Sequence, residues 1–159
     1  MMGGLSVEAA KVLIIVGSKS DLPKMEECRE MLESLGVASD LVVASAHRNP
    51  KKVTESVEEA EKGGVEVIIA GAGMAAHLPG VVAAYTDLPV IGGPLDSGLP
   101  GGVEALFSIG QMPPGVPVAA VAVGGAKNAA LLAARILSLK YPEVREKLKE
   151  CRKKLAEGS

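Results

Sequence analysis

The stretch VLIIVGSKSD, residues 12–21, decides the fold, because an apolar and mostly β-branched run leads directly into a turn of small and polar residues. The run predicts a buried strand, and the turn predicts the start of a helix. Further apolar runs start near Leu41, Val65, Leu88 and Val116, the last extending to Val123, and each is followed by a glycine- or proline-rich turn. These repeated strand–helix units predict an α/β fold, in which helices cover both faces of a parallel sheet of about five strands.

Two helices have clear start and stop signals. Ser20 or Asp21 can cap the first helix, which ends at Gly36. Its apolar positions fall on one face, namely Met25, Cys28, Leu32 and Leu35. The second helix begins at Pro50, with Asn49 as its cap.

The C-terminal part of the chain contains two helical patterns of different character. Residues 128–139 are rich in alanine and too apolar for a solvated helix, so we expect them to pack on the sheet or on another subunit. Residues 142–156 form a charged helix whose thin apolar stripe predicts a C-terminal arm laid on a neighbour. The stripe consists of Val144, Leu148, Cys151 and Leu155. With no internal linker or repeat, residues 1–159 are predicted to form a single catalytic domain with a flexible N-terminal segment at residues 1–10.

Composition narrows the class of protein. A formal net charge of -2 and the small aromatic content, with one Phe, two Tyr and no Trp, argue against a nucleic-acid partner. No apolar run approaches the ~20 residues that cross a bilayer, and no signal peptide is recognisable, so we expect a cytoplasmic protein without a membrane partner. Cys28 and Cys151 lie far apart on apolar stripes, which predicts two core thiols.

The only two histidines both follow apolar runs, in loops of very small residues. His47 and Arg48 lie in SAHRNP (45–50), and His77 lies in GAGMAAHLPG (71–80). The carboxyl ends of parallel strands meet at one edge of a sheet, so these loops and the turn at 17–21 are expected to form one site. An imidazole exchanges protons near neutral pH, and a neighbouring arginine suits a phosphorylated ligand. We therefore predict that His47 transfers protons, whereas His77 is equally well a packed residue satisfied by a backbone carbonyl.

The remaining loop features are less specific. The turn at 17–21 offers hydroxyls and amides to a phosphate, and Asp21 could bind a ribose hydroxyl or an amine; alternatively, Ser20 and Asp21 only cap the helix. The glycine and alanine residues of 71–80 would let a small ligand touch the backbone. The glycine-rich residues 98–102 have few side chains, and we expect them to form either a simple turn or a lid. Two histidines without an acidic or cysteine cluster make a weak metal site, so we expect no metal.

Several segments, in order along nearly the whole chain, carry a resemblance to a known family. They are GSKSD (17–21), SAHR (45–48), AGAG with AAHLPG (70–80), SIGQMP (108–113), GVPVA (115–119) and NAALLAARIL (128–137). With these segments the chain resembles the N5-carboxyaminoimidazole ribonucleotide mutases of purine biosynthesis, the class I type of the aminoimidazole ribonucleotide (AIR) carboxylase family. The resemblance implies a flavodoxin-like three-layer, doubly wound sheet, a homo-octamer, no cofactor, and transfer of a carboxylate from the exocyclic nitrogen to ring carbon 4 of the nucleotide.

The same resemblance implies roles for individual residues. His47 would be the general acid and base, and His77 is a second candidate catalytic residue. Arg48 would bind the phosphate of the aminoimidazole ribonucleotide substrate, and Ser18 and Asp21 would hold the ribonucleotide. The further implied substrate-binding residues are Ser45, Gly73, Met74, Ala76 and Leu78.

Two single positions and one segment depart from the family pattern. Met74 stands where the mutases usually have a glycine, Leu22 replaces a usual aromatic residue, and GPLDS (93–97) replaces a Gly-Val-Pro-Val segment. The last is reminiscent of the AIR carboxylases that use carbon dioxide directly, but that group lacks the histidine of AAHLPG, so direct carboxylation is the second hypothesis. A non-catalytic nucleotide- or flavin-binding module on the same fold is a third, although few aromatic residues are available to bind a flavin.

Overall fold

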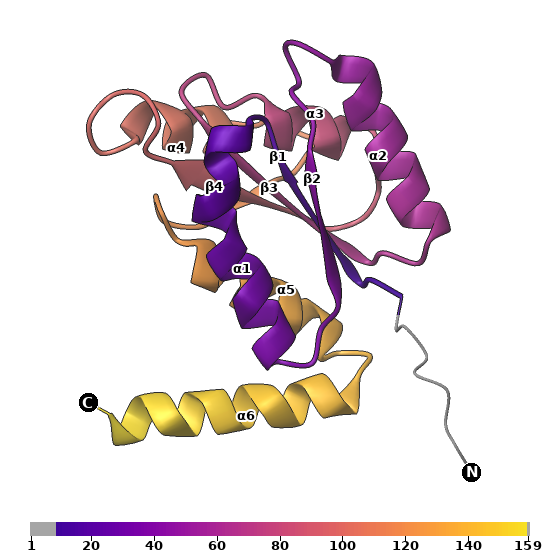
Figure 1. Ribbon diagram of the computed structural model, residues 1–159, viewed down its shortest axis with the longest axis vertical. Coiled ribbons are helices and arrows are strands. Elements are labelled where there is room, and N and C mark those ends of the chain that lie inside the picture. Colours follow the sequence, from indigo (N-terminus) through magenta and orange to yellow (C-terminus); the bar gives the residue numbers. More distant parts are fainter. Residues whose placement is uncertain (1–8, 159) are drawn as a thin grey trace.

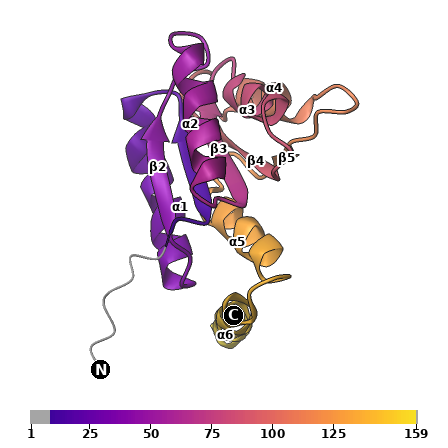
Figure 2. The same ribbon diagram turned by 90° about the vertical axis from the view of Figure 1, so that its right-hand side faces the viewer.

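The computed structural model describes residues 9–158, and within this range the strands form one five-stranded sheet. The strands are β1 (Val12–Val16), β2 (Ser39–Val43), β3 (Val67–Gly73), β4 (Val90–Leu95) and β5 (Ala119–Ala120). All neighbouring pairs are parallel, in the order β2-β1-β3-β4-β5 (Figure 2). This is the order of the flavodoxin-like doubly wound fold, which confirms the predicted fold class.

Helices cover both faces of the sheet (Figure 1). They are α1 (Leu22–Ser34), α2 (Pro50–Lys62), α3 (Leu78–Ala84), α4 (Val103–Gly110), α5 (Ala126–Leu137) and α6 (Pro142–Glu157). One core cluster joins the sheet to α1 and α5, and a second joins it to α2, α3 and α4. The chain therefore builds three layers, with the sheet in the middle.

The alternation of β1 explains why both faces can be covered. Val12, Ile14 and Val16 pack toward α1 and α5, whereas Leu13 and Ile15 pack toward α2. All five residues are 0–2% exposed. A strand buried on both faces needs an apolar residue at every position, and residues 12–16 supply one at each.

The two helices with clear sequence signals form as expected. The Asn49 side chain accepts a hydrogen bond from the backbone N–H of Lys52 at 3.1 Å and caps α2. Gly36 follows α1 at a φ of +74°, a left-handed conformation that glycine adopts readily. Cys28 is fully buried on α1, and this burial raises the pKa of its thiol to about 12, as expected of an unreactive core thiol.

Two details differ from the sequence-based expectations. The fifth strand was expected to span Val116–Val123, but its register with β4 covers only Ala119 and Ala120. Pro117 has no N–H with which to extend the pairing on the amino side, and on the other side Val121 adds a single bond from its N–H to the Gly92 carbonyl at 3.2 Å. The apolar stripe of α6 was expected to lie on a neighbour, but most of it packs on the chain's own core. Val144 is buried there, and Leu148 and Cys151 pack against the same core cluster.

Helix α6 lies across one end of the molecule, beyond the ends of α1 and α5 (Figure 1). Only Leu155 of the stripe is strongly exposed, at 66%. Of the N-terminal segment predicted to be flexible, residues 1–8 lie outside the described residues, and residues 9 and 10 have irregular backbone.

Candidate active site

The loops after β1, β2 and β3 meet at the carboxyl edge of the sheet and enclose a cavity of about 530 Å³. This position next to the point where the strand order reverses is where doubly wound sheets bind ligands. Nine of the predicted site residues line the cavity: Ser18, Asp21, Ser45, His47, Arg48, Gly73, Met74, His77 and Leu78. Ala76 does not line it, since it is 1% exposed and belongs to the core beneath α2 and α3.

The two histidines contact each other directly. Nε2 of His47 lies 2.6 Å from Nδ1 of His77, and the rings are edge-to-face with centroids 4.7 Å apart. Such a hydrogen bond needs one proton between the facing nitrogens, so one ring donates while the other accepts. Sequence reasoning left His77 open between packing and function, and its ring is bonded to His47 rather than to a backbone carbonyl. Both rings are exposed at the cavity, so the pair can pass a proton to or from a bound molecule.

Arg48 connects two of the loops. Its Nη2 donates to the carbonyl oxygen of Gly17 at 2.8 Å, and its Nε donates to Oγ of Ser45 at 3.2 Å. The same Ser45 hydroxyl accepts from the backbone N–H of Arg48, also at 3.2 Å. These bonds fix the guanidinium beside the cavity while other N–H donors of the planar fork stay unused, which suits bidentate recognition of a phosphate or carboxylate.

The turn after β1 contains a short 3-10 helix before α1 begins. Residues Lys19–Asp21 form a short 3-10 turn whose cap is Ser18, and the Ser18 and Ser20 hydroxyls lie 3.0 Å apart. Asp21 occupies the N-cap position of α1 but makes no side-chain capping bond, although it is only 6% exposed. The alternative that Asp21 only caps the helix therefore does not describe this structure, because its carboxylate makes no capping bond.

The segment after β4 approaches the same cavity and was not assigned a role from sequence. Ser97 lines the cavity and donates from Oγ to Oδ1 of Asp21 at 3.3 Å. A Cβ on Gly73 would lie 2.6 Å from Cβ of Ser97, so the end of β3 and this segment touch only because residue 73 is glycine. Two features of the sequence mark this segment: Asp96 and Ser97 directly follow a strand, as the other site loops do, and they belong to the GPLDS stretch that departs from the family pattern.

Glu104 at the start of α4 holds the segment that contains the predicted turn or lid. Its Oε1 accepts from the backbone N–H of Leu99 at 2.9 Å. Its Oε2 is buried and has no hydrogen-bond partner among residues 9–158. Met74 lies nearby, and its backbone has a φ of 56°, a value that residues other than glycine rarely adopt. Backbone in an unusual conformation therefore occurs at the rim of the cavity, as is common at functional sites.

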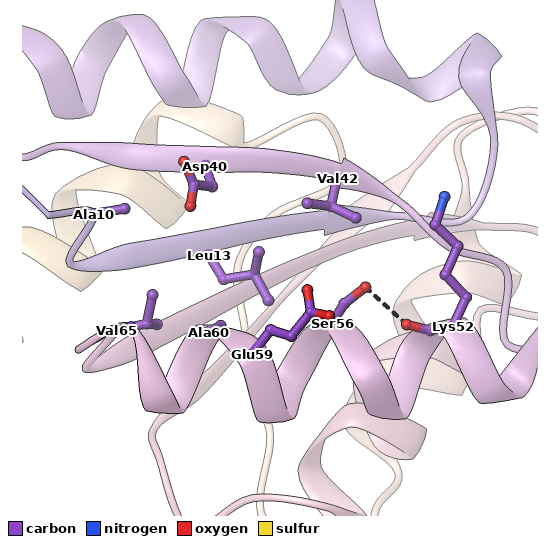
Figure 3. Close-up of a pocket in the computed structure, with 10 residues that line it drawn as sticks. Ala10, Leu13, Asp40, Val42, Lys52, Ser56, Glu59, Ala60 and Val65 are labelled. Carbon is purple, nitrogen blue, oxygen red and sulfur yellow. Dashed lines mark hydrogen bonds between the residues drawn. The ribbon is translucent and has the colours of Figure 1, made fainter.

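A second hollow, of about 300 Å³, lies between α2 and the strands β1 and β2 (Figure 3). The buried residues that line it, Leu13 and Val65, are apolar, and its charged groups, Asp40, Lys52 and Glu59, are exposed. The Ser56 hydroxyl donates to the Lys52 carbonyl of its own helix at 2.7 Å. This hollow thus lacks a fixed polar group directed at a ligand, whereas the histidine cavity has several.

Among residues 9–158, no group of three or more His, Cys, Asp or Glu side chains has the arrangement of a metal site. Over the same residues, no helix is both long enough and apolar enough to span a membrane.

Comparison with known proteins identifies the family. The family model described as AIR carboxylase matches residues 11–158. The chain belongs to the AIR carboxylase family. A relative from Pyrococcus abyssi, named N5-carboxyaminoimidazole ribonucleotide mutase, is 57% identical over 93% of this chain and 85% of its own length. A relative of the same name from Thermotoga maritima is 53% identical over 91% of this chain and 85% of its length.

Solved structures support the assignment to the AIR carboxylase family. Crystal structures of a PurE2 variant and of PurE from Treponema denticola match with TM-scores of 0.84 and 0.81, each at 31% identity over 92% of this chain. The matches cover 91% and 92% of those chains. The family resemblance inferred from the sequence motifs is thereby confirmed, and so is the fold that it implied.

Proposed function

We propose that the chain is an N5-carboxyaminoimidazole ribonucleotide mutase of purine biosynthesis. The observation that carries this proposal is the hydrogen-bonded histidine pair beside an anchored arginine, in a chain that is more than half identical to relatives named as this mutase. The reaction moves a carboxylate from the exocyclic nitrogen to carbon 4 of the imidazole ring. It consumes and releases no other molecule, so the site needs only to bind one nucleotide, retain carbon dioxide and move one proton.

The reaction requires one proton to be delivered and one to be removed, and the histidine pair can do both. Cleavage of the bond between nitrogen and carboxylate carbon releases carbon dioxide, and the nitrogen takes up a proton. The electron-rich ring then attacks carbon dioxide through carbon 4, forming the new carbon–carbon bond, and the proton on carbon 4 must leave to restore the aromatic ring. His47 can deliver the first proton and remove the second, and its bond to His77 provides a second nitrogen to hold a proton in between.

The surrounding residues supply binding rather than proton transfer. We assign the nucleotide phosphate to Arg48, positioned by Ser45, and the ribose to Ser18 and Asp21. The wall made by Gly73, Met74 and Leu78, together with Ala72 and Ala75, would keep carbon dioxide close to the ring and water away from it.

Two substrates decide between the mutase and the second hypothesis, direct carboxylation. Purified protein is given the carbamate nucleotide in one assay, and the uncarboxylated nucleotide with bicarbonate in another. We expect rapid turnover of the carbamate, with labelled bicarbonate entering the product slowly compared with turnover. Efficient use of bicarbonate with no activity on the carbamate would identify a carboxylase instead, and no activity on either would favour a nucleotide-binding module.

We further propose that the chain assembles, as a homo-octamer, and that it works in the cytoplasm as a metabolic enzyme. Exposed apolar side chains support assembly: Phe107 and Val103 of α4 are 60% and 52% exposed, and both alanines of the edge strand β5 are exposed. Apolar surface of this kind is typical of subunit interfaces. Light scattering at micromolar concentration should give the mass of eight chains, and a monomer would contradict the proposal.

A further inference from the structure

A chain of hydrogen bonds connects α1, the segment after β4 and Asp21. Lys24 lies on the first turn of α1, and its Nζ donates to Oγ of Ser97 at 3.0 Å and to the carbonyl oxygen of Asp96 at 3.5 Å. Ser97 donates in turn to Oδ1 of Asp21 at 3.3 Å. Among residues 9–158, Ser97 is the only hydrogen-bond donor to this carboxylate, and Asp21 is the only buried charged residue.

The chemistry of the three groups fixes the direction of these bonds. A lysine ammonium can only donate, so Oγ of Ser97 must accept from Lys24. The serine hydroxyl therefore turns its own hydrogen elsewhere, and Oδ1 of Asp21 is the acceptor within reach. One carboxylate oxygen of Asp21 is thus held by the protein, while the other is left for a donor from a ligand in the cavity.

We propose that Ser97 and Lys24 are positioning residues that orient Asp21 toward the ribose hydroxyls of the nucleotide. The inference rests on the proposed function for the identity of the ligand, but the hydrogen-bond chain itself does not. Lys24 also holds the backbone at Asp96, so the same contact fixes the segment that touches Gly73 at the cavity. No pattern in the sequence linked α1 to this segment, because the residues lie more than seventy positions apart.

The test measures binding and turnover separately in four variants. Ser97→Ala removes the donor to Asp21, Lys24→Met removes the ammonium, Lys24→Arg keeps a cationic donor, and the fourth variant combines Ser97→Ala with Lys24→Met. Lys127→Met is the matched control, since this lysine is also exposed and pairs with Glu27 of α1 at 3.3 Å, away from the cavity lining. Affinity for the uncarboxylated nucleotide is measured by calorimetry, and KM and kcat are measured on the carbamate.

We expect Ser97→Ala to raise Kd and KM about tenfold while kcat changes far less, because an Asp21 carboxylate that Ser97 no longer orients forms a weaker charge-assisted hydrogen bond to the ribose. Lys24→Met should raise Kd about threefold, and Lys24→Arg should remain close to the parent. The double variant should bind no more weakly than Ser97→Ala alone, because both residues act through Asp21. Unchanged Kd and KM in Ser97→Ala, or effects of the two substitutions that multiply, would overturn the inference.

A ligand-free measurement separates this inference from the proposed function. The NMR resonance of the Asp21 carboxyl carbon should shift in Ser97→Ala and stay in place in Lys127→Met. If the parent chain neither binds the nucleotide nor turns over the carbamate, the proposed function fails, and the resonance still tests the bond. If the parent is active but Ser97→Ala leaves the resonance, Kd and KM unchanged, only the positioning role fails.

Discussion

The two ends of the sheet carry two clusters of charged and titratable side chains with opposite properties. At the amino end, Glu66 accepts from Lys140 at 2.9 Å and from the Tyr141 hydroxyl, and Lys11 lies 3.9 Å away. Both lysines also lie over the Tyr141 ring, with Nζ of Lys11 5.7 Å and Nζ of Lys140 5.3 Å from its centroid. Every member of this cluster is paired within the chain, and the cluster ties the start of α6 to the sheet.

At the carboxyl end, the polar groups are fixed but not saturated. Within residues 9–158, Arg48 is anchored and keeps free donors, Asp21 has one partner for two oxygens, and the histidines share a single hydrogen bond beside an open cavity. The difference teaches that the chain uses satisfied polar groups for stability and leaves unsatisfied ones where a ligand can complete them. Substitutions at the two ends should therefore affect different measurements.

The largest effect is expected from His47→Asn, which removes the proton-transferring ring and keeps a polar side chain. Turnover of the carbamate should fall by about 10²–10⁴, the usual contribution of a positioned acid–base group. Binding of the product nucleotide and the melting temperature should change little, because His47 is exposed. Turnover close to that of the parent in a correctly folded variant would remove His47 from its assigned role.

Arg48→Ala should act on binding. Loss of charge-assisted bonds to a phosphate is expected to cost about 1.5–3 kcal/mol, which corresponds to a roughly 10- to 100-fold weaker Kd for the product nucleotide. Arg145→Ala is the control, because the guanidinium of this exposed arginine of α6 donates to the Ser138 carbonyl at 3.1 Å and does not line the cavity. If titration gives equal Kd values for Arg48→Ala and the parent, the phosphate lies elsewhere.

Glu66→Gln tests the amino end and should change stability without changing activity. Partial burial favours a higher pKa for Glu66, but bonds from Tyr141 and Lys140 outweigh it and hold the pKa below its usual value of 4.5. A lowered folded-state pKa contributes stability that is present above the unfolded-state pKa and is lost as the pH falls through the folded-state pKa.

At neutral pH, Glu66→Gln should therefore lower the free energy of unfolding. The loss should not exceed about 1 kcal/mol, because the ion pair between Glu66 and Lys140 is partly exposed to solvent. The difference from the parent should shrink as the pH falls below 4.5. Urea unfolding at several pH values measures this difference. A gap that stays constant down to acid pH would show that the charge of Glu66 contributes nothing.

The smallest effect is expected from Met74→Gly. Glycine removes the strain of a side chain at a φ of 56°, roughly 1–2 kcal/mol, but gains roughly 0.5–1 kcal/mol of unfolded-state freedom. The free energy of unfolding should therefore rise by about 0–1.5 kcal/mol, with a central value of roughly 0.7 kcal/mol. Thermal unfolding tests this, and a marked loss of stability would mean that the Met74 side chain is held by packing, despite its 60% exposure.

Sequence reasoning predicted the elements whose signals are local. The apolar run of β1, the Asn49 cap of α2 and the grouping of loops at one sheet edge all follow from periodicity and topology. It could not predict that His47 and His77 are bonded, or that Lys24 reaches Ser97, because such contacts depend on side-chain distances across loops. The fifth strand was overestimated because apolar alternation does not reveal how many residues find a pairing partner.

The unequal burial of the two cysteines makes the chain suitable for site-specific labelling without mutation. Cys28 is fully buried, whereas Cys151 is half-buried where α6 meets the core. A thiol-specific fluorophore should therefore react first at Cys151 and leave Cys28 unmodified in the folded protein. The fluorophore would then report when α6 separates from α5, so undocking of this helix could be followed independently of unfolding of the sheet.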